Sequence, residues 1–165
     1  VLATETIGKE TMISAYRLPS LGILPDHPLY KLKVVRDKLM LKLILNPVKK
    51  IEYYLILSDK GYAESTLLAK KGNLALAGET ARRAEHFYTL LIGDYKWATW
   101  RHASVPRMLT KSITKSGLAH QKILEELAQQ AGEEDKKAFE EVAEFSKRNY
   151  QTLVTFVEQE VVETP

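Results

Sequence analysis

The chain has 165 residues, of which 45% are hydrophobic and 27% are charged, and its formal net charge is +3. This length supports one hydrophobic core, and the small positive charge is too low to indicate nucleic acid as a partner. The sequence contains no cysteine, which excludes disulfides, thiolate nucleophiles and cysteine-bound zinc or iron–sulfur centres.

The first 25 residues predict an extended leader or tether rather than a regular element. They show no sustained periodicity and contain four residues that interrupt secondary structure, Gly8, Pro19, Gly22 and Pro25. Pro25 disfavours helix at the residue before it, Asp26 can cap a following helix, and Pro28 suits a first turn. We therefore expect the folded domain to occupy residues 26–163.

A short helix is predicted from about residue 28 to residue 45. It places four leucines on one face, Leu29, Leu32, Leu39 and Leu43. Arg36 falls on the same face, and we interpret it as a snorkelling or paired side chain. The segment is too short and too often interrupted to cross a membrane, since Lys42 breaks its most apolar part and Asn46-Pro47 ends it. We expect no transmembrane segment in this chain.

Two long helices are predicted next. Asn46 caps the first and Pro47 occupies its first turn. Apolar and small residues then alternate steps of three and four, at Val48, Ile51, Leu55, Ser58, Tyr62, Ser65 and Ala69. Gly72 is a C-cap candidate. The same pattern continues at Leu74, Ala77, Ala81, Ala84, Tyr88, Leu91, Tyr95 and Ala98. This spacing is typical of helices that face other helices at a shallow angle.

Two more long helices follow a turn near residues 102–104. The first carries Val105, Leu109, Ser112, Ser116, Ala119, Ile123, Leu127 and Gln130 at the same spacing. Ala131-Gly132 ends it, and three acidic residues at 133–135 suit the first turn of the last helix. The apolar face of this last helix is predicted at Ala138, Val142, Phe145, Asn149, Thr152 and Phe156.

These elements predict an all-α fold, an up-down-up-down four-helix bundle with an additional shorter N-terminal helix. Four segments of similar length joined by tight turns favour antiparallel neighbours. We expect breaks near residues 46, 72, 103 and 132, and no sheet. Nine large side chains should point inward: Ile51, Leu55, Tyr62, Tyr88, Leu91, Ile123, Val142, Phe145 and Phe156.

The sequence offers no set of residues typical of a metal centre. A di-iron bundle requires two Glu-x-x-His motifs and two further inward glutamates, and the chain has no such motif. Its histidines are His27, His86, His102 and His120. Glu125 lies five residues after His120, a spacing that does not put both groups on one helix face. We expect no metal and no cofactor.

An enzyme is also not indicated. Ser112 and Lys115 match the Ser-x-x-Lys pattern of serine acyl-enzymes, but the companion motifs Ser-Asp-Asn and Lys-Thr-Gly are missing. We interpret them as a buried small residue and a solvated lysine. No glycine-rich phosphate loop is present either. The sequence provides no combination of acid, base and nucleophile.

The best candidate for a binding surface lies where the second long helix meets the third. Two tryptophans there fall off the apolar seam, so at least one should face outward. A stripe of basic residues repeats every four positions nearby. The six candidate residues are Trp97, Trp100, Arg101, Arg107, Lys111 and Lys115. They suit an anionic partner such as a membrane headgroup, a wall polymer or an acidic protein surface. In the alternative interpretation, the tryptophans cap the bundle and the basic residues are a solvated face.

The domain begins with a pattern of eight residues, Leu24, Pro25, Asp26, Pro28, Leu29, Tyr30, Leu32 and Lys33. This opening resembles that of domain-of-unknown-function family 5667, a bacterial family. The similarity continues at Arg36-Asp37, Asn46-Pro47, Lys49-Lys50, Glu52, Leu55 and Asp59-Lys60. The chain departs from the pattern at Gly61, where arginine is expected, and at Ile51, where alanine is expected. The resemblance implies an all-helical, exported domain, often preceded by a signal peptide or membrane anchor, with no assigned chemistry.

Together these observations favour a non-enzymatic, extracytoplasmic helical domain that acts as a structural, adaptor or sensor module. Its expected partner is a protein or an anionic component of the cell envelope. The alternative is a small-ligand-binding bundle whose internal cavity is lined by polar seam residues, namely Ser58, Ser65, Ser112, Ser116, Asn149 and Thr152. These groups can also be satisfied by one another or by helix carbonyls, which would leave no polar cavity.

Overall fold

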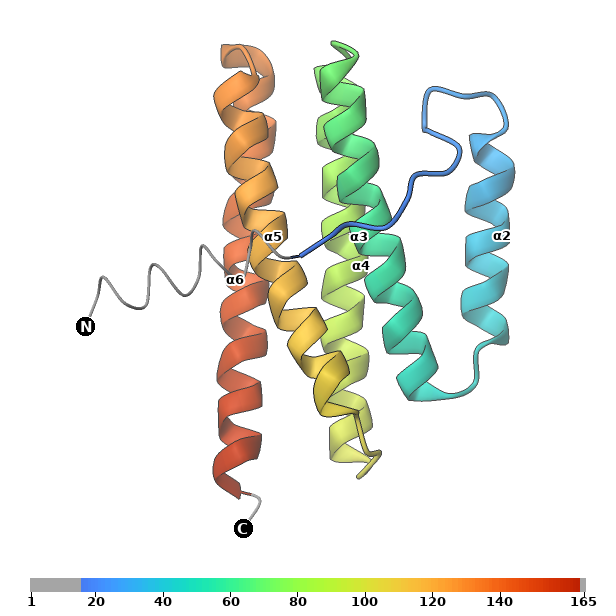
Figure 1. Ribbon diagram of the computed structural model, residues 1–165, viewed down its shortest axis with the longest axis vertical. Helices are drawn as coiled ribbons and strands as arrows, with labels where there is room; N and C mark the ends of the chain where they lie inside the picture. Colours follow the sequence, from blue (N-terminus) through green and yellow to red (C-terminus); the bar gives the residue numbers. More distant parts are fainter. Residues whose placement is uncertain (1–15, 164–165) are drawn as a thin grey trace, which may run out of the picture.

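The computed structural model describes residues 16–163, and within that range the chain forms helices and no strand (Figure 1). The five helices are α2 (Tyr30–Leu43), α3 (Pro47–Lys70), α4 (Leu74–Trp100), α5 (Arg107–Gln130) and α6 (Glu133–Glu163). The predicted all-helical fold is confirmed. None of the helices in this range has the length and apolar content needed to cross a bilayer.

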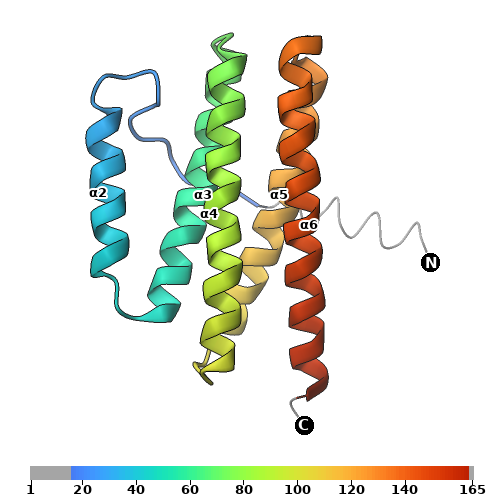
Figure 2. The same cartoon turned by 180° about the vertical axis from the view of Figure 1, so that it is seen from behind.

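Successive helices run in alternating directions, as the colour gradient shows in both views (Figures 1 and 2). The long helices pack in a ring, in which α3 contacts α4 and α5, while α6 contacts α4 and α5. The α2 helix stands at one edge of the molecule, beside α3, and α6 lies at the opposite edge (Figure 2). The outer side of α2 is therefore covered by no other helix.

The helix boundaries follow local sequence signals. Asn46 accepts a hydrogen bond from the Lys49 amide at 3.0 Å, with Pro47 as the first helical residue. Asn73 caps α4 in the same way, through the Leu76 amide at 3.3 Å. Gly72, between α3 and α4, has a φ of 82°, a conformation that glycine adopts without strain. The four predicted breaks all fall between helices.

Helices α3 and α4 approach closely because residue 61 is glycine. A Cβ atom built on Gly61 would lie 2.6 Å from the Ala84 Cβ and 3.2 Å from the Ala84 Cα. Any larger residue at this position would push the two helices apart. Glycine at residue 61 therefore permits the tight packing of α3 on α4.

The core consists of two apolar clusters. One surrounds Tyr88 and Leu91, and the other surrounds Tyr62 and Phe139. None of the nine side chains predicted to point inward is exposed. Six are buried, and the three that are half-buried are Ile123, Phe145 and Phe156.

The predicted inner face of α6 is rotated relative to the structure. Val142 and Asn149 are buried as expected, but the other buried positions are Phe139, Ser146 and Leu153 rather than their neighbours Ala138, Phe145 and Thr152. A similar shift in α5 buries Ile113 and Leu124 more deeply than Ser112 and Ile123, and leaves Gln130 exposed. The cause in α6 is that a polar residue, Ser146, occupies a core position that hydrophobicity cannot identify.

The orientation of α2 is opposite to the one its sequence suggests. A helix that packed through its apolar face would bury its four leucines. In the structure all four are exposed, Leu32 to 73% and Leu43 to 64%. The buried residue of α2 is Asp37, and its inner side also carries Tyr30 and Lys33. On its inner side α2 packs Leu41 against the core and offers Lys33 and Asp37 to polar partners on α3.

The predicted leader, residues 1–25, is described only from residue 16. Residues 16–29 are irregular, with turns just before α2. Tyr16 nevertheless reaches the bundle interior, where its hydroxyl donates to Asp59 Oδ2 at 2.5 Å. This part of the leader is therefore attached to the domain by a side chain that enters the core.

Candidate functional site

A buried polar cluster joins α3, α5 and the segment before α2. The Asp59 carboxylate on α3 accepts a hydrogen bond from Ser116 Oγ at 2.6 Å and lies 2.8 Å from His120 Nε2. Ser116 and His120 lie one turn apart on α5, with 3.0 Å between Oγ and Nε2. The Tyr16 hydroxyl donates a hydrogen bond to the other oxygen of this carboxylate. Three elements distant in sequence are thus joined through one carboxylate.

The His120 ring is enclosed by two tyrosines. Tyr62 stacks on it with 3.9 Å between ring centroids, and Tyr88 meets it edge-on at 5.3 Å. The Tyr88 hydroxyl donates to the Ile113 carbonyl at 2.8 Å. His120 is completely buried, and its Nδ1 has no hydrogen-bond partner among the described residues.

A second buried cluster is connected to the first through Tyr62. The Tyr62 hydroxyl donates to Glu85 Oε2 at 2.5 Å, and Asn149 Nδ2 donates to Glu85 Oε1 at 2.7 Å. Asn149 also donates to Thr89 Oγ1 at 2.9 Å. Burial, followed by the nearby Glu85 carboxyl group, raises the pKa of Tyr62 and of Tyr88 well above the usual value. Both phenols are therefore held in their neutral, hydrogen-donating form.

The Ser116, His120 and Asp59 side chains are the three types found in serine hydrolases, but their arrangement is different. In a catalytic triad the histidine contacts the serine through one ring nitrogen and the carboxylate through the other. Here both contacts are made by Nε2, and the serine hydroxyl proton points to the carboxylate. Ser116 and His120 are also fully buried. The geometry suits a cluster that fixes helix positions rather than one that attacks a substrate.

From the sequence, His120 was considered only as a possible metal ligand, and its contact with Asp59 was not predicted. Ser116 was on the predicted inner face of α5, and His120, one turn later, was not. The pairing with α3 could not be read from helical periodicity. In residues 16–163, no three His, Cys, Asp or Glu side chains are grouped so as to hold a metal ion.

The six polar seam residues have individual explanations. Ser65 donates to the Ala77 carbonyl at 2.7 Å, and Ser112 and Thr152 donate to carbonyls one turn earlier on their own helices. Ser116 and Asn149 belong to the two buried clusters. Ser58 Oγ has no partner among the described residues. Five of the six are therefore satisfied by the protein itself.

The predicted tryptophan and basic surface lies around the connection between α4 and α5. Trp97 is 51% exposed and Trp100 is 74% exposed, so both face outward. The Arg101 guanidinium lies over the Trp97 ring, 5.5 Å from its centroid. On α5, Arg107 and Lys111 are exposed and Lys115 is half-buried. The structure thus keeps Trp97, Trp100 and Arg101 at the end of α4, and the three-residue stripe on the first turns of α5.

A larger apolar surface is formed by the outer side of α2, which the sequence analysis assigned to packing. We call it the outward face of α2, and its residues are Leu29, Leu32, Val35, Leu39, Met40 and Leu43. Arg36 lies within this face and pairs with Asp37 at 2.7 Å. Exposed apolar patches on single-chain proteins are typical of interaction sites. The outward face of α2 is therefore a candidate functional surface.

The inner side of α2 is fixed by polar contacts. Lys33 forms an ion pair with Glu64 on α3, and both side chains are almost fully buried. The Tyr30 hydroxyl lies 3.5 Å from Glu64 Oε2, and burial together with that carboxylate raises the pKa of Tyr30 to about 12. Tyr53 donates to Asp37 Oδ1 at 3.2 Å. These contacts hold the outward face of α2 away from the bundle.

A cleft of about 380 Å³ lies between α2, α3 and α4. Its lining combines apolar side chains such as Leu57 and Phe87 with Lys60 and Arg83. Neither of these two cations has an acidic partner in residues 16–163. The volume is in the range of small-molecule sites. The lining also includes the carboxylates Asp37 and Glu64, which pair with Arg36 and Lys33, so that Lys60 and Arg83 are among the charges left to meet a small anion with an apolar body.

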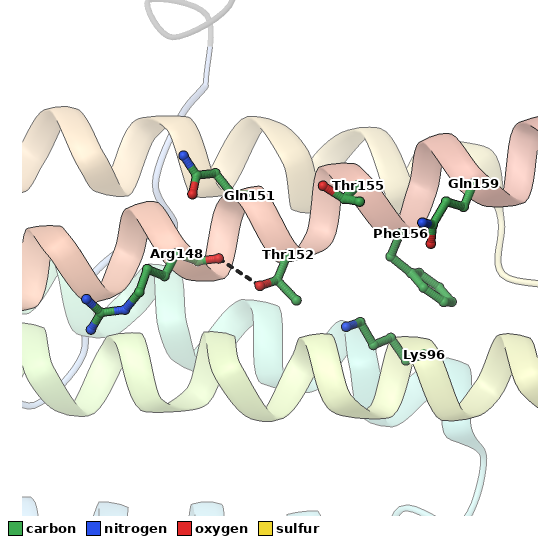
Figure 3. Close-up of a pocket in the computed structure, with 7 residues that line it drawn as sticks. All are labelled: Lys96, Arg148, Gln151, Thr152, Thr155, Phe156 and Gln159. Atoms are coloured by element: carbon green, nitrogen blue, oxygen red, sulfur yellow. Dashed lines mark hydrogen bonds between the residues drawn. The ribbon is translucent and has the colours of Figure 1, made fainter.

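A second hollow, of about 490 Å³, lies between α4 and α6 (Figure 3). Figure 3 shows Lys96 projecting from α4 toward Phe156 on α6, and Lys96 Nζ lies 5.5 Å from the centroid of that ring. The other lining residues are Arg148, Gln151, Thr152, Thr155 and Gln159, all on α6. Thr152, predicted to line an internal cavity, instead borders this surface hollow.

Comparison with known proteins gives one family match. The family described as "Domain of unknown function (DUF5667)" matches residues 22–163, which include all five helices. The match agrees with the resemblance at the start of the domain. No curated protein and no solved structure matches the chain.

Proposed function

We propose that this chain, which belongs to the DUF5667 family of domains of unknown function, is a non-enzymatic extracytoplasmic interaction module. The observation that carries the proposal is the outward face of α2. Four leucines that the bundle leaves uncovered would lose contact with water only by meeting another surface. The module would serve a structural, adaptor or sensor role through that contact.

The distribution of reactive groups supports the non-enzymatic part of the proposal. The buried carboxylates Asp59 and Glu85 contact only other protein groups, and the histidine in the cluster is fully enclosed. A general acid, base or nucleophile must reach a substrate, and these side chains do not.

The interaction is tested by placing a photo-crosslinking amino acid at Leu32 or Leu39 in the full native gene product, expressed in its own host. We expect adducts at these two positions after irradiation, with a protein or a lipid. The matched control is Glu140, an exposed position on α6 at the opposite edge of the molecule. Adducts that are absent at both leucines, or equally abundant at Glu140, would contradict the proposal.

The extracytoplasmic setting has its own test. The family resemblance implies export, and cell fractionation of the same host should recover the protein outside the cytoplasm. Recovery in the cytoplasmic fraction would contradict this part of the proposal without affecting the interaction.

The tryptophan and basic surface at α4 and α5 remains a second proposed contact, for an anionic component of the cell envelope. Changing Arg107, Lys111 and Lys115 to glutamate should weaken binding to anionic wall polymers or vesicles, most strongly at low salt. The fold should survive these changes. Equal binding by the parent and the variant would leave these residues as a solvated face.

The alternative function, small-ligand binding, is favoured by the cleft beside α2 rather than by the polar seam residues. We expect laurate, an anion with an apolar body, to raise the thermal unfolding midpoint. Lys60→Glu together with Arg83→Glu should abolish the increase, and Lys122→Glu, on exposed α5 surface, should keep it. No increase in the parent protein would contradict this function.

A further inference from the structure

We propose that the outward face of α2 lies on the surface of an anionic lipid bilayer. This inference rests on the proposed interaction function and names the partner. It draws on three features of the described residues: the apolar face itself, the charges that border it, and the contacts that fix its orientation.

The apolar face has the form of an interfacial helix. It runs the whole length of α2, about 21 Å for 14 residues at 1.5 Å per residue. It belongs to a single helix at the edge of the molecule, so it is convex rather than a groove (Figures 1 and 2). A convex apolar helix face suits a soft, flat partner into which side chains can sink by a few ångströms.

One border of this face is basic. Lys31, Lys38 and Lys42 are separated by seven and four residues, which places them in one row on the helix beside Val35 and Leu39. All three are exposed, and none forms an ion pair or hydrogen bond within residues 16–163. Lysines in this position can bury their aliphatic part against lipid and extend their ammonium groups to phosphate.

The acidic groups of α2 are removed from the same surface. Asp37 is the only acidic residue of the helix, and it is buried on the inner side, where Arg36 and Tyr53 contact it. The outward face of α2 and its border therefore carry positive charge only. This is charge complementarity to an anionic surface, in addition to apolar complementarity.

The same charges argue against pairing with a second copy of the chain. A two-fold contact through the outward face of α2 with the helices antiparallel would bring the two rows of lysine to the same border, where they repel. The remaining alternative partner is another protein with an acidic and apolar surface. With such a partner the chain would not need to bind vesicles, because the contact requires no lipid.

The outward face of α2 is already exposed in the unbound protein. The buried Lys33–Glu64 pair and the Asp37 contacts hold the polar side of α2 on the bundle. The leucines are thus oriented outward without any rearrangement of the helix. Binding to a surface would require no unfolding, which lowers its cost.

The test measures binding of the full chain to vesicles of phosphatidylcholine with and without phosphatidylglycerol. We expect binding only when phosphatidylglycerol is present, and weaker binding as salt increases. Changing Lys31, Lys38 and Lys42 to glutamate should reduce the partition coefficient at least about a hundredfold, because each lysine near an anionic surface contributes about 1 kcal/mol of attraction and each glutamate is repelled. Leu32→Gln with Leu39→Gln should reduce it about tenfold without a change in net charge.

The matched control alters the same number of charges elsewhere. Lys122, Lys137 and Lys147 are exposed on α5 and α6, and changing them to glutamate should lower the partition coefficient less than about threefold at roughly 0.1 M salt, where screening acts over ~10 Å. An equal loss in this control, or a larger loss in the Arg107, Lys111 and Lys115 variant than in the α2 variant, would overturn the proposal.

Failure of the inference can be told from failure of the proposed function. If the parent chain does not bind anionic vesicles but Leu32 crosslinks to a protein, the bilayer is excluded and the interaction module stands. If neither vesicles nor crosslinked partners are found, both proposals fail.

Discussion

The core of the bundle and the outer side of α2 reverse the usual distribution of polar and apolar residues. At the centre, Asp59 and Glu85 are buried in clusters of hydrogen bonds. At the edge, Leu32 and its neighbours are exposed. Among residues 16–163, polarity follows the available partners: the buried carboxylates have donors that satisfy them, whereas the leucines of α2 are covered by no other helix.

The largest expected effect is at the core side of this comparison. Glu85→Ala removes the acceptor that Tyr62 and Asn149 share, so the buried Tyr62 hydroxyl loses this carboxylate and Asn149 Nδ2 keeps only its bond to Thr89. We expect a loss of about 3–5 kcal/mol in the free energy of unfolding, measured by urea denaturation. Glu79→Ala, an exposed position on the same helix, should change it by less than about 0.5 kcal/mol. Similar small effects for both variants would mean that the Glu85 cluster contributes little.

A smaller loss is expected where α3 and α4 meet. Gly61→Ala places a methyl group 2.6 Å from the Ala84 Cβ, so the helices must separate. The expected loss is about 1–3 kcal/mol. Gly93→Ala is the control, because a Cβ there meets nothing within 4 Å, and better helix propensity should stabilise the protein by up to about 1 kcal/mol. Stabilisation by both changes would contradict the close approach.

The buried tyrosines predict a loss of stability at high pH. Their pKa values are higher in the folded protein than in the unfolded chain, where they are near 10. Their contribution is therefore complete below pH about 10 and is lost as the pH rises toward the folded values. Tyr62 and Tyr88 should each contribute a slope of about 1.4 kcal/mol per pH unit above that point. Tyr30 should add to it up to about pH 12.

Urea denaturation at a series of pH values measures this slope. Tyr88→Phe should reduce this slope by the contribution of one tyrosine, about 1.4 kcal/mol per pH unit. A free energy of unfolding that stays constant up to pH 11 would show that these phenols ionise as easily in the folded protein as in the unfolded chain.

The smallest expected effect is at the edge side of the comparison. Leu32→Gln with Leu39→Gln should change the free energy of unfolding by less than about 0.5 kcal/mol, because neither side chain is buried. Leu91→Ala, in the core, should cost about 2–5 kcal/mol. A large loss in the α2 variant, measured in the same way, would mean that its leucines pack against the protein.

The success of sequence reasoning differs between helices for the same physical reason. In α4 the predicted seam consists of small, aliphatic and aromatic residues and is buried except at half-buried Leu74, although Glu85 beside it is also buried. In α6 the core includes Ser146 and Asn149, so hydrophobicity favoured the wrong neighbour, Phe145, which lies beneath the Arg148 guanidinium instead. Periodicity identifies a face only where the face is apolar.

Helical periodicity could not predict that the leucines of α2 form an exposed surface. The leucines at their helical spacing correctly indicated an amphipathic helix, but spacing cannot say which side meets the bundle. That choice depends on Glu64 and Tyr53, which are distant in sequence and offer partners to Lys33 and Asp37. The cluster of Asp59 and His120 escaped prediction for the same reason.

The most direct test of the contrast uses the absence of cysteine in the chain. Leu32→Cys and Leu91→Cys are compared for their rate of reaction with a maleimide, in solution and with phosphatidylglycerol-containing vesicles. We expect Leu32→Cys to react at the rate of an exposed thiol and to become protected by the vesicles, and Leu91→Cys to be unreactive in both conditions. Slow reaction of Leu32→Cys in solution would contradict the outward orientation of α2, and fast reaction with vesicles present would contradict its contact with the bilayer.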